Sequence, residues 1–115
     1  MEELIARVAA STGIEPDVAE QAIAAIFNFL QQEGPKPQIA FVLAQLPGAQ
    51  AAADGADSPG FGGLMGLASQ LMGLGLGMGQ LQVAGREIFG YVRERAGDDT
   101  IREITGAIPG LSQFI

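Results

Sequence analysis

Carboxylates are the side chains of this chain best suited to acid–base or metal chemistry, because the sequence contains no His and no Cys. The best adjacent pair is Asp98 with Asp99, and Asp54 with Asp57 is a second candidate pair. A calcium site needs at least about five oxygen ligands at set spacing, which neither pair offers. Capping of a helix explains the first pair, and solubility of a linker explains the second. The sequence therefore predicts no metal ligands.

Covalent catalysis and cofactor binding find equally little support in the residue types. The lack of Cys, His and Trp excludes thiol nucleophiles, imidazole ligands and a serine–histidine relay. The glycine-rich segment from Gly73 to Gly79 contains neither G-x-G-x-x-G nor Gly-Lys-Ser/Thr, so it predicts a connection between helices rather than a phosphate-binding loop. We expect no catalytic residues, no cofactor and no enzymatic activity.

The net charge limits the classes of partner that we expect, and the charge of the N-terminus bears on the expected compartment. The chain has 13 acidic and 6 basic residues, for a net charge of −7, so we expect no nucleic acid among its partners. The N-terminus, Met1-Glu2-Glu3, is acidic where a secretory signal peptide is basic, which favours a cytoplasmic protein. The stretch 58–85 is free of charge, but its glycines argue against a transmembrane helix.

Hydrophobic periodicity indicates helices in both halves of the chain, and no segment alternates in the manner of a strand. Glycine and proline mark the ends of these helices, and Asp98 is predicted to cap the last one. The expected fold class is all-α, with about six helices that pack as one domain over residues 1–115. The helices are expected at about 2–10, 17–33, 37–45, 64–71, 80–95 and 99–107.

An offset of 62 residues aligns the two halves. Six residues between positions 22 and 48 are identical to their counterparts, among them Phe27 with Phe89 and Ile39 with Ile101. At several further aligned positions, both halves have an apolar residue, and a shared packing scheme would preserve this agreement. The sequence therefore predicts two quasi-equivalent helical repeats. Their expected limits are repeat one at 1–48, a linker at 49–60 and repeat two at 61–115.

Two resemblances to known families are carried by short motifs. The second half contains Gly66-Leu67-Ala68-Ser69-Gln70-Leu71, Glu87-Ile88-Phe89 and Ala107-Ile108-Pro109-Gly110-Leu111. These motifs resemble a small bacterial family of unknown function typified by the VcgC/VcgE proteins, which implies an all-α domain and no known activity.

The first half contains Glu3-Leu4-Ile5-Ala6-Arg7-Val8-Ala9-Ala10, Thr12-Gly13-Ile14 and Val18-Ala19-Glu20-Gln21-Ala22-Ile23. These segments are similar to the N-terminal helical hairpin of the HU/IHF DNA-binding proteins. Members of that family continue into a β-ribbon with basic arms, whereas this chain continues Pro35-Lys36-Pro37. We interpret the similarity as a common way to pair two helices.

The helix expected at 37–45 is apolar on nearly every side. At three positions, Ala40, Phe41 and Leu43, the second repeat has the polar Arg102, Glu103 and Thr105. A helix that is apolar all round must be covered on more than one side. We therefore expect Phe41, Ala40 and Leu43 to meet a second subunit across a twofold axis. The leading function is a non-enzymatic interaction or scaffold protein that self-associates as a homodimer.

The glycine-rich part of the second half suggests an alternative function. Its methionines, Met65, Met72 and Met78, lie close in sequence to Leu76. Methionine adapts its shape to apolar ligands and partner helices. These four residues predict an apolar groove, and the alternative function is a carrier or sensor that binds an apolar small molecule or lipid there.

Overall fold

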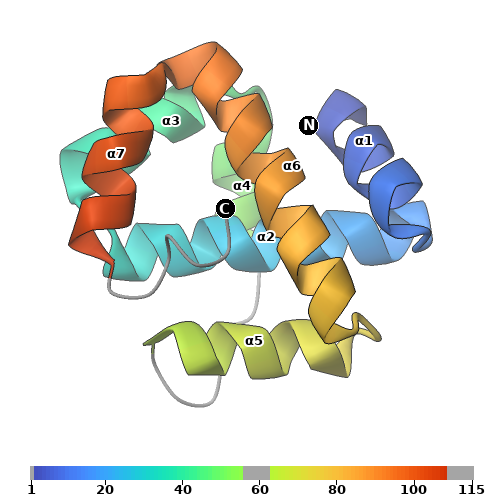
Figure 1. Ribbon diagram of the computed structural model, residues 1–115. Helices are drawn as coiled ribbons and strands as arrows, with labels where there is room; N and C mark the ends of the chain where they lie inside the picture. The colour runs from blue at the N-terminus through green and yellow to red at the C-terminus, as the bar shows by residue number, and fades with distance from the viewer. Residues whose placement is uncertain (1, 56–62, 109–115) are drawn as a thin grey trace.

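Helices account for all the regular structure in the computed structural model, which describes residues 2–55 and 63–108 (Figure 1). No strand occurs in these two ranges, so the predicted all-α class is confirmed. The helices are α1 (Glu2–Thr12), α2 (Pro16–Glu33), α3 (Lys36–Gln45), α4 (Ala49–Gly55), α5 (Gly63–Gly73), α6 (Met78–Ala96) and α7 (Asp98–Ala107). None of the helices in the described ranges has the length and apolar character needed to cross a membrane.

The ends of the two long helices, α2 and α6, follow from local sequence. Pro16 opens α2, where a missing N–H costs nothing, and Asp17 lies in the first turn, near the positive end of the helix dipole. Gly77 precedes α6, and its N–H donates to Oε1 of Gln80 at 2.8 Å. Gly97 ends α6 with φ of +95°, a backbone conformation that favours glycine.

The two repeats interlock. Helix α1 packs against α6, and α5 packs against α2, so the first helix of each repeat covers the long helix of the other. In Figure 1, α5 runs along α2, while α6 crosses α2 in the view and turns back as α7. Helices α3 and α7 also contact each other. The buried side chains of both halves form one continuous core.

Helix limits and burial both follow the 62-residue offset. Helices α2 and α6 begin at residues 16 and 78, and α3 and α7 span 36–45 and 98–107. Equivalent apolar residues are buried in both copies. They are Ala22 and Ala84, Ile26 and Ile88, Phe27 and Phe89, Phe29 and Tyr91, Leu30 and Val92, Ile39 and Ile101, Val42 and Ile104, and Leu46 and Ile108. The repeat predicted from the sequence is therefore present in the packing.

The predicted linker at 49–60 is wrong over its first seven residues, which form α4. Ala49 and Ala53, one helical turn apart, are fully buried, and α4 packs against α2 and α3. Alanine is the best helix former and buries its small side chain at almost no entropic cost, so a stretch without large apolar residues still docks as a helix. Residues 56–60 of that prediction lie outside the described ranges, as does the Pro109-Gly110-Leu111 motif.

The prediction that Asp98 caps α7 is also wrong. Gly97 occupies the N-cap position, and no side chain bonds to the free N–H groups of the first turn. The carboxylate of Asp98 instead pairs with Arg93, with an Oδ1–Nε distance of 2.9 Å. Because α6 and α7 share Gly97 as their boundary residue, Asp98 already lies inside the helix.

Candidate functional site

The outer face of α3 is largely apolar. Its exposed residues include Pro37, Ala40, Phe41 and Ala44. The Phe41 side chain is 47% exposed. The face contains no acidic residue, and its only charge is that of Lys36 at the first position of the helix. We call this set the α3 face.

Comparison with the equivalent helix shows that the α3 face is not required by the fold. Ile39, Val42 and Leu46 turn inward from α3 as Ile101, Ile104 and Ile108 do from α7. On the outer side, however, α7 presents Arg102 and Glu103 where α3 presents Ala40 and Phe41. The same helical packing is thus compatible with a charged outer surface. Apolar residues there need a reason other than core formation.

A cleft of about 390 Å³ adjoins the α3 face. It lies among α2, α3 and α4, and its lining contains no acidic residue. We call it the α3 cleft. Helix α3 supplies Lys36, Ile39, Ala40 and Leu43, α2 supplies Asn28, Gln31 and Gln32, and α4 supplies Gln50.

Side-chain amides hold one wall of the α3 cleft in place. Asn28 donates from Nδ2 to the carbonyl of Ala53 at 2.9 Å, and its Oδ1 accepts from Gln32 at 3.1 Å. Gln31 and Gln50 both donate to Oδ1 of Asp54, at 3.1 and 3.0 Å. The bonds from Asn28 to Ala53 and from Gln31 to Asp54 connect α2 to α4. The cleft therefore has a hydrogen-bonded polar wall, which faces an apolar floor.

The structure separates the three residues predicted to form the subunit interface. Phe41 and Ala40 are exposed, and Ala40 also lines the α3 cleft. Leu43 is only 4% exposed and belongs to the core, so its assignment to the outer surface is wrong. One helical turn from Ile39, it follows the inward-facing side of α3 and reaches the surface only as part of the cleft floor.

Neither described cleft gathers the residues predicted to form an apolar groove. Met65, Met72 and Met78 are 75%, 50% and 58% exposed, and neither lining includes them. Leu76 is 2% exposed and belongs to the core, so the groove stays a prediction. Leu76 follows Gly75, whose φ of +104° reverses the chain between α5 and α6.

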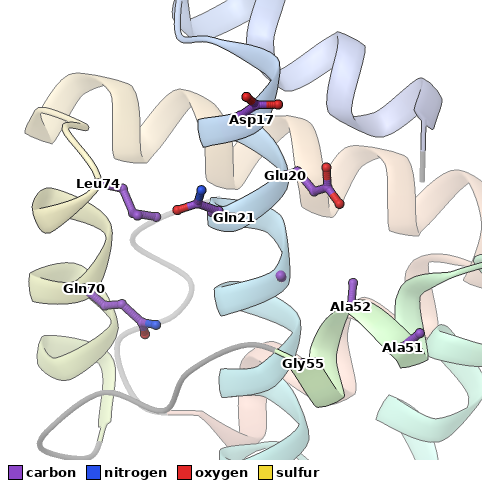
Figure 2. A pocket seen from close by; sticks show the side chains of 9 residues that line it. Asp17, Glu20, Gln21, Ala51, Ala52, Gly55, Gln70 and Leu74 are labelled. Atoms are coloured by element: carbon purple, nitrogen blue, oxygen red, sulfur yellow. The ribbon is translucent and has the colours of Figure 1, made fainter.

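A second cleft of about 610 Å³ lies over α2, with α4 on one side and α5 on the other (Figure 2). In Figure 2, Gln21 of α2 and Gln70 of α5 extend into the space between these two helices. Asp17 and Glu20 add carboxylates on α2, and no basic residue lines the cleft. Neither cleft has a hydroxyl, thiol or imidazole in its lining. Within the described ranges, no three acidic side chains gather closely enough to hold a metal ion.

Sequence reasoning missed a charged cluster between α1 and α6. Arg7 pairs with Glu87 at 3.5 Å and with Glu94 at 3.0 Å, while Arg95 pairs with Glu3 at 3.3 Å. The hydrogen bond to Glu94 is the main cause of the raised pKa of Arg7; burial acts in the opposite direction, and the charges of Glu94, Glu87 and Glu3 add to the rise. The Arg7 guanidinium is therefore charged at any pH below the ordinary arginine pKa.

Both guanidinium groups of this cluster lie over the buried ring of Tyr91. The distances from Cζ to the ring centroid are 5.4 Å for Arg7 and 4.2 Å for Arg95, within the range of cation–π attraction. Arg95 also donates to the Tyr91 hydroxyl at 3.0 Å. The ion pairs Arg7–Glu94 and Arg95–Glu3 join residues that are more than 80 positions apart in the sequence. Every charged group of the cluster has a partner, so the cluster fastens α1 to α6.

Comparison with known proteins finds no matching family model, no matching curated protein and no matching solved structure. The resemblances to the VcgC/VcgE-type family and to the HU/IHF hairpin therefore stay predictions. The assignment of a function to this chain rests on its own surface chemistry.

Proposed function

We propose that this chain is a non-enzymatic interaction or scaffold protein that self-associates through the α3 face. One observation carries the proposal: Phe41 stands half exposed among small apolar residues at a position where the equivalent helix has Glu103. An aromatic side chain in the centre of an apolar patch is the usual anchor of a protein–protein contact. A twofold contact places the same patch on both subunits, so a single exposed helix is sufficient.

Electrostatics favours α3 as the surface where two copies meet. Each copy has a net charge of −7, so two copies repel each other over most orientations. Helix α3 contains one Lys and no acidic residue. Helix α3 itself therefore brings no carboxylate to the contact, and the Glu103 carboxylate of α7 lies beside it, where it accepts a hydrogen bond from Gln38 at 2.6 Å. Helix α5 is also uncharged, but its exposed methionines are flexible and lose side-chain entropy when they are fixed in a contact.

The Phe41→Glu variant tests this function, with Met72→Glu as a matched control. Phe41 and Met72 are large apolar residues of similar exposure, 47% and 50%, on different helices. Burial of one Phe contributes about 1.5–3 kcal/mol, and a dimer buries two. We expect a dimeric parent, a folded monomeric Phe41→Glu variant and a dimeric Met72→Glu variant, measured by sedimentation equilibrium and circular dichroism.

Three results would contradict the proposal. A parent protein that is monomeric at every concentration has no self-association to explain. A Phe41→Glu variant that stays dimeric places the contact elsewhere, and one that unfolds assigns Phe41 to the core of its own chain.

The alternative function is a carrier of an apolar small molecule or lipid. The exposed methionines are compatible with binding to an apolar partner, but neither described cleft includes any of them in its lining. The geometry therefore favours self-association. Native mass spectrometry of the purified protein separates the two functions, because a carrier retains a bound molecule.

A further inference from the structure

We propose that Phe41 of each copy inserts into the α3 cleft of the other copy, so that the dimer is held by two reciprocal aromatic insertions. This inference rests on the proposed self-association and names the contact that carries it. Its basis is a juxtaposition: the exposed ring and the cleft lie on the same helix, since Ala40 lines the cleft and Phe41 follows it. Successive residues of a helix are about 100° apart, which puts the ring beside the cleft rather than in it.

A projection and an adjoining hollow on one surface fit a second copy of that surface. When two copies are related by a twofold axis, each projection faces the hollow of the other. Ala40 and Ala44 flank Phe41 on the exposed side and are small enough for the two α3 helices to approach closely. An unrelated partner would need only the projection or only the hollow. The presence of both on one face therefore points to a second copy of this chain.

The lining of the α3 cleft suits an aromatic ring. A cavity of about 150 Å³ is sufficient to hold benzene, so the cleft volume of about 390 Å³ accommodates a Phe side chain. Ile39 and Leu43 provide an apolar floor, and the ammonium group of Lys36 can lie over the face of the ring. No carboxylate lines the cleft to repel the electrons of that face.

The Ala40→Phe variant tests the insertion by filling the cleft from within. Ala40 is exposed, so the larger side chain is tolerated by the fold, while Phe41 is left in place. We expect the dimer Kd to rise about a hundredfold or more, because both insertions are blocked. The control is Ala51→Phe, the same substitution at an exposed alanine that lines the other cleft, and it leaves the Kd unchanged.

A mixing experiment tests the reciprocity. Phe41→Ala has an open cleft but no ring, and Ala40→Phe has a ring but a blocked cleft, so each self-associates weakly. In the mixture, one ring meets one open cleft, and we expect a heterodimer with a Kd at least about tenfold below that of either homodimer. Sedimentation with one variant fluorescently labelled measures it. A mixture that associates no better than its components overturns the insertion.

The Phe41→Trp variant provides a readout that does not depend on blocking the cleft. The chain has no other Trp, so indole fluorescence reports this position alone. We expect a blue shift and protection from acrylamide as the concentration passes the Kd. If Ala40→Phe dimerises as tightly as the parent, the insertion is wrong and the α3 contact stands. If the protein dimerises while the indole stays quenchable, position 41 lies outside the contact and both proposals are wrong. A parent protein that never dimerises contradicts both the self-association through the α3 face and the insertion of Phe41.

Discussion

Asn28 is the only buried polar side chain among the residues that the structure describes. It lies in α2 and satisfies a backbone carbonyl of α4 while its own oxygen accepts from Gln32. A buried amide is tolerated only when both of its ends are hydrogen-bonded. Helix α4 has no large apolar side chain that could pack against α2. The hydrogen bond from Asn28 takes over part of that role and holds α4 against α2.

Replacement of Asn28 by Leu is expected to lower the free energy of unfolding by about 1–3 kcal/mol, because the Ala53 carbonyl loses its donor without regaining water. Gln82→Ala is the control, since Gln82 is an exposed amide on α6 and the bonds of Asn28 are kept. Its expected change is within about 0.5 kcal/mol. Urea denaturation measures both. An Asn28→Leu variant as stable as the parent would show that the Ala53 carbonyl finds another donor.

The limits of the helices could largely be predicted from the sequence where glycine or proline lies at a helix end. They were harder to predict where neither residue marks the end. The predicted helices 17–33 and 37–45 each begin one residue later than α2 and α3 and end at the same residues. Helix α4 was missed because Ala49 and Ala53 give no large apolar period. At the candidate site, the exposure of Phe41 followed from comparing the repeats. The α3 cleft could not be predicted, since it depends on α4 docking against α2.

Two glycines in different settings give opposite expected effects when replaced by Ala. A Cβ at Gly34 would lie 2.7 Å from the Leu30 carbonyl oxygen and 2.9 Å from Cγ1 of Ile39 at the junction of α2 and α3. A Cβ at Gly90, inside α6, meets nothing within 4 Å. We expect Gly34→Ala to destabilise the fold and Gly90→Ala to stabilise it by about 1 kcal/mol. Thermal unfolding checks the signs, and equal signs would contradict the packing at this junction.

The whole molecule is an acidic particle whose proposed contact surface carries almost no charge of its own. Repulsion between two copies of net charge −7 therefore opposes dimerisation, and no ion pair across α3 compensates it. Screening lengths fall from about 30 Å at 0.01 M to about 10 Å at 0.1 M ionic strength.

Added salt is accordingly expected to tighten the dimer. Sedimentation equilibrium at low and moderate sodium chloride measures the change in Kd, with the Phe41→Glu variant as a monomeric reference at both concentrations. A Kd that rises with salt would indicate that oppositely charged groups meet at the interface, and would exclude the α3 face as its centre.

In the proposed dimer, the difference between α3 and α7 determines whether assembly stops at two copies. An internally duplicated chain that carried an adhesive helix in both repeats would be bivalent, and bivalent units link into open-ended polymers. Because α7 has Arg102 and Glu103 at the positions of Ala40 and Phe41, we expect it not to self-associate, which leaves one contact surface per chain. Restoring the first-repeat residues with Arg102→Ala and Glu103→Phe is expected to convert the dimer into long oligomers, visible by light scattering. In the proposed assembly, the charged pair on α7 thus acts as a chain terminator for a protein whose duplication would otherwise make it a polymer.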